Sequence, residues 1–259
     1  MNASFGSKIT AVKLSIVWLL AAAAANAQVV FQDDTFANGN WTATKIFDGT
    51  SGSAGTFSAG QVGSGGAPGS YRETTLGTSG AGVIVVAQEM SGAVYNPAVS
   101  GAISGLSYIF SVSATSVTPD LDPSPGTYVE ISLLIKQGGV YYSGQTSTTL
   151  SPDEVGIGWA GSGQSGLTGS NFSLVQGQSG AAQPDFSSSG APLQFGYMTS
   201  NQGLGTPDSN ASTTGVDNWS VSVAAVPEPA SWGSVVGASL IGFVAWRHRW
   251  PILSWRNER

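Results

Sequence analysis

The chain of 259 residues is long enough for one large β domain or two small ones, and a single domain is the simpler interpretation. Only 9% of its residues are charged, its formal net charge is −6, and between its two terminal segments only Lys45, Arg72 and Lys136 are basic. This acidic body excludes nucleic-acid binding, and the absence of cysteine excludes disulfides and thiol chemistry.

The N-terminus has the pattern of a secretion signal. Two lysines precede an apolar run that starts at Leu14, and Ala25-Asn26-Ala27 follows with small residues at the two positions that a signal peptidase inspects. We predict that residues 1–27 are a signal peptide and that cleavage occurs before Gln28.

The body, residues 28–225, has the pattern of an all-β domain. Segments with β-branched or aromatic residues at alternate positions are 83–86, 108–112, 128–135, 193–197 and 219–223. Such alternation is typical of half-buried antiparallel strands, and no segment has a capped apolar period of 3.6 residues. Gln137-Gly138-Gly139 favours a hairpin turn. We predict an antiparallel β-sandwich, jelly-roll-like, with long Gly/Ser loops.

The first and last segments of the body, 29–36 and 215–223, resemble the terminal strands of lectin-like and carbohydrate-binding jelly rolls, a resemblance that concerns the fold only. Such domains pair these strands, which would bring Asp33 and Asp34 near Asp217 and Asn218. Carboxylate and amide oxygens suit Ca²⁺, so we predict calcium as the one candidate cofactor. The alternative is that these residues cap turns.

The body lacks the residues of several catalytic sites. The single histidine, His248, lies in the C-terminal tail, so the body can form neither a Ser-His-Asp triad nor a histidine zinc site. A carboxylate pair could hydrolyse glycosides, but no acidic spacing here resembles a glycosidase signature. We predict that the protein is not an enzyme. The carboxylates available for the alternative are Glu89, Glu130, Asp153 and Glu154.

Aromatic side chains are the remaining candidates for ligand binding, because exposed Trp and Tyr rings stack on sugar faces. The candidates are Trp41, Trp159, Tyr141 and Tyr142, together with Tyr71. Trp159 lies between glycine and alanine and is the least typical of a core. The alternative for each is a place in the core of the sandwich.

The C-terminal tail, residues 226–259, has three parts in a fixed order. Pro227-Glu228-Pro229 leads into an apolar segment, 232–246, which Arg247-His248-Arg249 follows. This order resembles the PEP-CTERM sorting signal of bacterial surface proteins. The resemblance implies recognition by an exosortase, a membrane-embedded processing enzyme of certain Gram-negative bacteria. The extension 250–259 is longer than the basic end typical of that family.

Membrane physics supports the same topology. The apolar segment has 15 residues, fewer than the roughly 20 that span a bilayer comfortably, and this favours a transient anchor. Arg247 and Arg249 should stay cytoplasmic by the positive-inside rule, which places the body outside. A plain C-terminal anchor behind a stiff proline linker is the alternative.

These observations predict an exported protein that is first anchored in the inner membrane by a C-terminal helix and then reaches the cell surface or the extracellular matrix. We expect a non-enzymatic structural or adhesive role there, with extracellular polysaccharide as a partner. The alternative is a carbohydrate-binding module, with or without calcium.

Processing of the tail should require both the Pro-Glu-Pro motif and the apolar segment. Replacing Pro227, Glu228 and Pro229 with alanine lets helix extend outward and removes the carboxylate, so uncut precursor should accumulate in the membrane. Mass spectrometry of the surface form should find Gln28 at the N-terminus and no Arg259. An intact Arg259 in wild-type cells with an active exosortase would identify a plain anchor.

Overall fold

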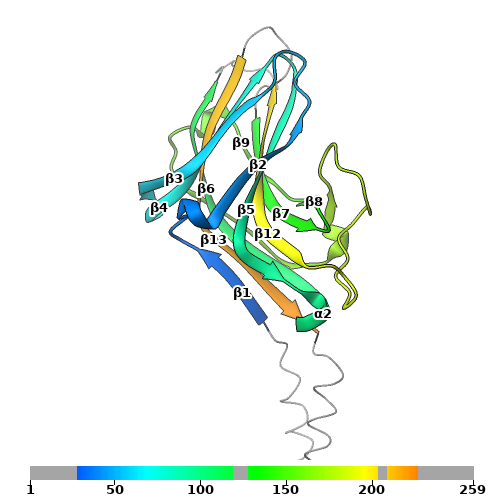
Figure 1. Cartoon of the computed structure of the whole chain (residues 1–259). Helices are drawn as coiled ribbons and strands as arrows, with labels where there is room; N and C mark the ends of the chain where they lie inside the picture. Colours follow the sequence, from blue (N-terminus) through cyan, green and yellow to red (C-terminus); the bar gives the residue numbers. More distant parts are fainter. Residues whose placement is uncertain (1–27, 119–127, 204–208, 227–259) are drawn as a thin grey trace, which may run out of the picture. The chain divides into compact units, whose positions relative to one another are not determined.

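The computed structural model describes residues 28–118, 128–203 and 209–226 (Figure 1). Gln28–Ala225 form one compact unit, and both sheets and the main hydrophobic core lie within it, so this segment holds the contacts of an independent folding unit. The predicted signal peptide and sorting motif lie outside the described residues and stay predictions. Within the described part of the chain, no helix is long and apolar enough to cross a membrane.

The first sheet has six strands in the order β10-β6-β13-β4-β3, and β1 also pairs with β13. All of its pairings are antiparallel. β13 bonds to β6 along one side, and to β4 and then β1 along the other (Figure 1). The strands are β1 (Gln28–Asp33), β3 (Thr56–Gly66), β4 (Gly69–Ser79), β6 (Ile103–Thr118), β10 (Ala160–Leu167) and β13 (Ser209–Ala225).

The second sheet has seven strands in the order β11-β8-β7-β12-β5-β2, and β9 pairs with β7. It is also antiparallel throughout. From β4 to β7, consecutive strands alternate between the two sheets. The strands are β2 (Trp41–Asp48), β5 (Gly82–Tyr95), β7 (Tyr128–Gln137), β8 (Val140–Gly144), β9 (Thr148–Leu150), β11 (Phe172–Leu174) and β12 (Leu193–Gly203).

The predicted all-β antiparallel sandwich is therefore confirmed. The five predicted strand segments lie within β5, β6, β7, β12 and β13. Gly138 and Gly139 both have positive φ in the hairpin that joins β7 to β8, as the predicted turn requires. The helical elements described are single turns: η1 (Asn38–Asn40), α2 (Pro97–Ser100), η2 (Pro152–Glu154) and η3 (Gly169–Asn171).

The core lies between the sheets and is rich in aromatic side chains. Trp41 of β2 packs against Phe36, Tyr197 and Trp219, with ring centroids 5.3, 5.6 and 5.3 Å away. Aromatic rings bury large areas and dominate core energetics. This cluster joins β2 and β12 of one sheet to β13 of the other.

A polar link also crosses the interior. Arg72 of β4 is only 3% exposed, and its Nε donates to Oε1 of Gln88 on β5 over 2.7 Å. Nε2 of Gln88 donates in turn to the Thr74 hydroxyl over 3.0 Å. The Arg72 guanidinium also lies 5.9 Å from the centre of the Trp41 ring. These contacts hydrogen-bond the two sheets directly to each other.

β12 and β5 approach each other closely at Gly196 of β12. A Cβ at this position would overlap the carbonyl oxygen of Gln88 on β5, a backbone atom that cannot move without breaking the ladder. We expect Gly196→Ala to lower the free energy of unfolding by about 1–3 kcal/mol or more in a denaturant titration. Gly161→Ala is the control, because a Cβ on Gly161 meets no atom within 4 Å. Equal effects of the two variants would contradict this packing.

Candidate functional site

Three of the aromatic residues predicted to contact sugar are core residues instead. Trp41, Tyr141 and Tyr142 are 4%, 8% and 3% exposed. Trp41 fills the space between the sheets, and Tyr142 belongs to the same core cluster. Tyr141 packs in a second cluster on the other face of the seven-stranded sheet. An alternating strand pattern does not show which aromatic faces are covered, and burial corrects the prediction for these three.

Trp159 is half-buried and lies against the outer face of the six-stranded sheet. Its Nε1 donates to the carbonyl of Gly65 over 2.9 Å, and its ring meets the Tyr71 ring edge-on at 5.2 Å. Gly215 of β13 makes room for the pair, because a Cβ there would lie 2.7 Å from the Trp159 ring. Trp159 thus anchors the turn between β3 and β4, and it keeps more exposed surface than the other predicted aromatics.

Asp33 lies at the end of β1, opposite Trp219 of β13, so the predicted pairing of the terminal strands is correct. Its Oδ1 accepts hydrogen bonds from Thr35 N, Thr35 Oγ1 and Phe36 N, and its Oδ2 accepts one from Trp41 Nε1 over 2.8 Å. Burial raises the pKa of Asp33, but these hydrogen bonds outweigh burial and hold the pKa below its ordinary value. The carboxylate therefore fixes the loop between β1 and β2.

Asp217 is fully buried in β13 and serves a different loop. Its Oδ2 accepts a hydrogen bond from Ala67 N, and its Oδ1 accepts one from the backbone of Asn218. Nδ2 of Asn218 donates to the Ala67 carbonyl over 2.7 Å. These two residues clamp the turn between β3 and β4, the same turn that Trp159 holds.

The predicted calcium ligands are therefore divided between two loops. Asp34 is exposed beside Asp33, while Asp217 and Asn218 bond to the turn around Ala67. Within the three described ranges, no group of three or more acidic or histidine side chains is placed to hold a metal ion. Their observed partners match the alternative interpretation, in which these residues fix turns.

The carboxylates considered for glycoside hydrolysis are also engaged or far apart. Glu89 accepts from Lys136 Nζ over 2.8 Å and from the Tyr141 hydroxyl over 2.7 Å. On β12, Ser200 pairs with Glu130 of β7 and Gly196 pairs with Glu89 of β5. The two carboxylates are therefore offset by four residues, about 13 Å along the strand direction. Glycosidases need a separation of about 5–9.5 Å. Glu154 bonds to Ser151, and Asp153 is exposed beside it.

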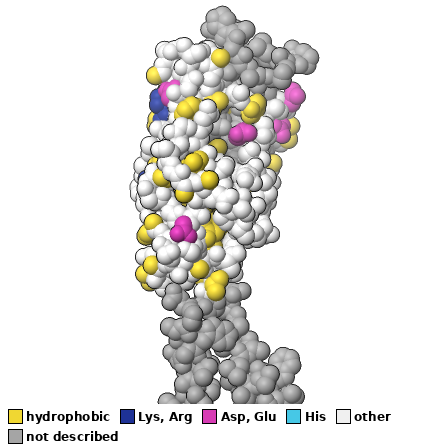
Figure 2. All heavy atoms as spheres, turned by 90° about the vertical axis from the view of Figure 1, so that its right-hand side faces the viewer, with side chains coloured by type: hydrophobic (Ala, Val, Ile, Leu, Met, Phe, Trp, Pro, Cys, Tyr) yellow, Lys and Arg dark blue, Asp and Glu magenta, His cyan; other side chains and the backbone are white. Residues whose placement is uncertain are grey.

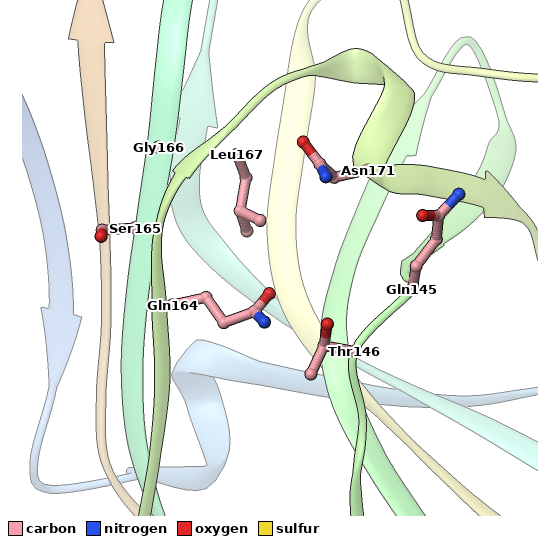
Figure 3. A pocket seen from close by; sticks show the side chains of 7 residues that line it. All are labelled: Gln145, Thr146, Gln164, Ser165, Gly166, Leu167 and Asn171. Atoms are coloured by element: carbon pink, nitrogen blue, oxygen red, sulfur yellow. The ribbon is translucent and has the colours of Figure 1, made fainter.

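A pocket of about 420 Å³ lies where the edges of the two sheets meet (Figure 3). Gln145 and Thr146 follow β8 of the seven-stranded sheet, while β10 of the six-stranded sheet supplies the opposite wall. Figure 3 shows the Gln164 and Thr146 side chains extending toward each other across the pocket. The lining residues are Gln145, Thr146, Gln164, Ser165, Gly166, Leu167 and Asn171.

Local structure holds these groups in place. A bulge in β10 between Gln164 and Leu167 turns the strand, and Gly166 accommodates the turn with a φ of 70°. Oδ1 of Asn171 accepts hydrogen bonds from the backbone and hydroxyl of Thr168. The Gln145 backbone N–H donates to the Asn171 carbonyl over 2.9 Å. The two walls are thus connected at η3, and buried Leu167 adds an apolar contact.

The chemistry of the pocket is that of neutral hydrogen bonding. Its lining holds three amide side chains and the Thr146 hydroxyl, the Ser165 side chain lies on the other side of β10 (Figure 3), and no lining residue is ionisable. Amides donate and accept at once, and hydroxyls do the same. The pocket therefore suits an uncharged polar ligand and offers no acid or base. Sequence reasoning missed it because Gln and Asn in Gly/Ser-rich segments look like ordinary turn residues.

No protein-family profile matches the chain, and neither does any curated protein. Among solved structures, the chain is similar to a family 11 carbohydrate-binding module from Clostridium thermocellum bound to a β-1,3-1,4-mixed-linked tetrasaccharide. The TM-score is 0.40 at 13% identity, over 79% of this chain and 99% of that one. The module of the cellulase Lic26A-Cel5E from the same organism has a TM-score of 0.41 at 13% identity, over 79% and 98%. Similarity at this level assigns neither a ligand nor an activity.

Acid should destabilise the body partly through Asp33. Because its pKa is lower in the folded state, its contribution to stability is present above pH ~4 and is lost as the pH falls through the folded pKa. We expect Asp33→Asn to lower Tm at neutral pH and to flatten the fall of Tm below pH ~4. Asp34→Asn, on the exposed neighbour, is the control. Parallel acid profiles for wild type and Asp33→Asn, measured by circular dichroism melts, would contradict this role.

Proposed function

We propose that the chain is an exported, non-enzymatic β-sandwich that binds carbohydrate and thereby has an adhesive role at the cell surface or in the extracellular matrix. The observation that carries the proposal is the pocket between Thr146 and Gln164, which offers amides and a hydroxyl without any ionisable group. Sugars present many neutral donors and acceptors, and such a lining matches them.

The amides in the walls of the pocket support the same ligand class. Leu167 is only 7% exposed and packs in the core, so the orientation of the sugar hydroxyls would be fixed by the amides. One wall of the pocket is β10, the end strand of its sheet. A segment of a longer glycan could enter it from the side.

The sequence signals at the two ends support export. The basic flank, the apolar run and the small residues before Gln28 favour secretion, and the Pro227-Glu228-Pro229 motif with its apolar segment and arginines favours exosortase sorting. An exported carbohydrate-binding body would meet its ligand outside the cell, because polysaccharide surrounds many bacterial cells. The precursor would be anchored in the inner membrane, and the processed protein would act outside it.

A glycan array with the purified body, residues 28–225, tests the proposal. We expect selective binding to a subset of glycans, with affinity reduced about threefold to tenfold by Gln164→Ala or Thr146→Val, because each removes about one hydrogen bond. Gln32→Ala is the matched control, since Gln32 is an exposed glutamine on β1. The set of glycans bound on the array should be the same with calcium and with a chelator.

Two results would overturn the proposal. One is an array with no glycan bound above background by a folded body. The other is glycan binding that Gln164→Ala and Thr146→Val leave at the wild-type affinity, because the ligand would then lie elsewhere on the sandwich.

A further inference from the structure

The three cations in the described part of the body are all occupied or buried. Nζ of Lys45 lies 2.6 Å from Asp48 and also donates to the Gly55 carbonyl over 2.9 Å. Nζ of Lys136 lies 2.8 Å from Glu89 and 5.1 Å from the centre of the Tyr141 ring. Arg72 is 3% exposed between the sheets. Each described lysine of the body thus already has a carboxylate partner, and none of the three cations lines the pocket.

Carboxylates outnumber these cations. On the face shown in Figure 2, acidic side chains are scattered among neutral groups, and the basic side chain that is visible lies beside an acidic one. The lining of the pocket adds no positive charge. A polyanion that approaches this body therefore meets net repulsion and no compensating ion pair.

We infer that the ligand of the pocket is a neutral glycan, and that uronate-bearing or sulfated polysaccharides are rejected. This inference rests on the proposed function. Binding an anionic sugar would desolvate its charge against amides and a hydroxyl, and buried charges need an ionic partner or a metal. A neutral glycan loses only hydrogen bonds to water, which the Gln164 amide, Gln145 Oε1 and Asn171 Nδ2 replace, because Gln145 Nε2 and Asn171 Oδ1 already bond to Ser170 and Thr168.

The charge distribution also predicts how binding responds to salt. Affinity that depends on ion pairs falls steeply as salt screens the charges, whereas hydrogen bonds between neutral groups are hardly affected. The Kd for a neutral glycan should therefore change by less than about twofold between low and high salt.

The test compares a neutral β-glucan with alginate, a polyuronate, by calorimetry on the purified body at low and high salt. We expect salt-independent binding to the neutral polymer and none to alginate. Gln164→Lys places one cation in the pocket, and it should gain measurable, salt-sensitive binding to alginate. Gln32→Lys adds the same charge on β1, about three strand spacings across the sheet from β10, and should not gain it.

The outcomes separate this inference from the proposed function. If the array shows no bound glycan, both fail. If wild-type protein binds alginate or another anionic glycan better than neutral ones, the neutral-ligand inference fails while carbohydrate binding stands. If wild-type protein binds alginate, the measurement is repeated with a chelator. Loss of that binding would mean that calcium supplies the missing positive charge.

Discussion

The sandwich depends on the hydrogen-bond pairing of β13. This strand of 17 residues bonds to β6 along one side and to β4 and β1 along the other, so three parts of the chain that are distant in sequence share one ladder. Its inward side chains, Val216, Trp219, Val221 and Val223, enter the core. Asp217 and Asn218 clamp the turn between β3 and β4. In a body without disulfides, this one strand holds β1, β4 and β6 of the first sheet together.

The buried and half-buried ionic groups each have specific hydrogen-bond partners. Asp33 and Asp217 take hydrogen bonds from loops, Glu89 pairs with Lys136, and Arg72 links the sheets through Gln88. Buried charges are tolerated only where such partners exist, and each removal would leave an unsatisfied group. The surface is left mostly to Gly, Ser, Thr and amides. The hydrogen-bonding groups on this surface are therefore mostly neutral.

Some features of the candidate site could be predicted from the sequence, and others could not. The resemblance of the first and last segments to jelly-roll strands predicted that these strands pair, and the observed pairing does place Asp33 beside β13. The choice between metal ligand and turn cap depended on which backbone N–H groups face each carboxylate, and strand patterns carry no such information. The glycine and alanine that flank Trp159 in the sequence indicated that it is the least typical of a core, and it does keep more exposed surface than the other candidates. Trp41, Tyr141 and Tyr142 differ from it only in the residues that pack on them, which the sequence does not show.

The sequence by itself determined the fold class, because alternation of apolar residues is a local property of strands that must bury one face. It also determined the charge of the body, and it predicts the two terminal signals. Only the tertiary structure decided the pocket, since Thr146 follows β8 of one sheet, Gln164 lies in β10 of the other, and both line the same pocket. The pairing of Lys136 with Glu89 was likewise decided by folding, because the two residues are 47 positions apart in the sequence.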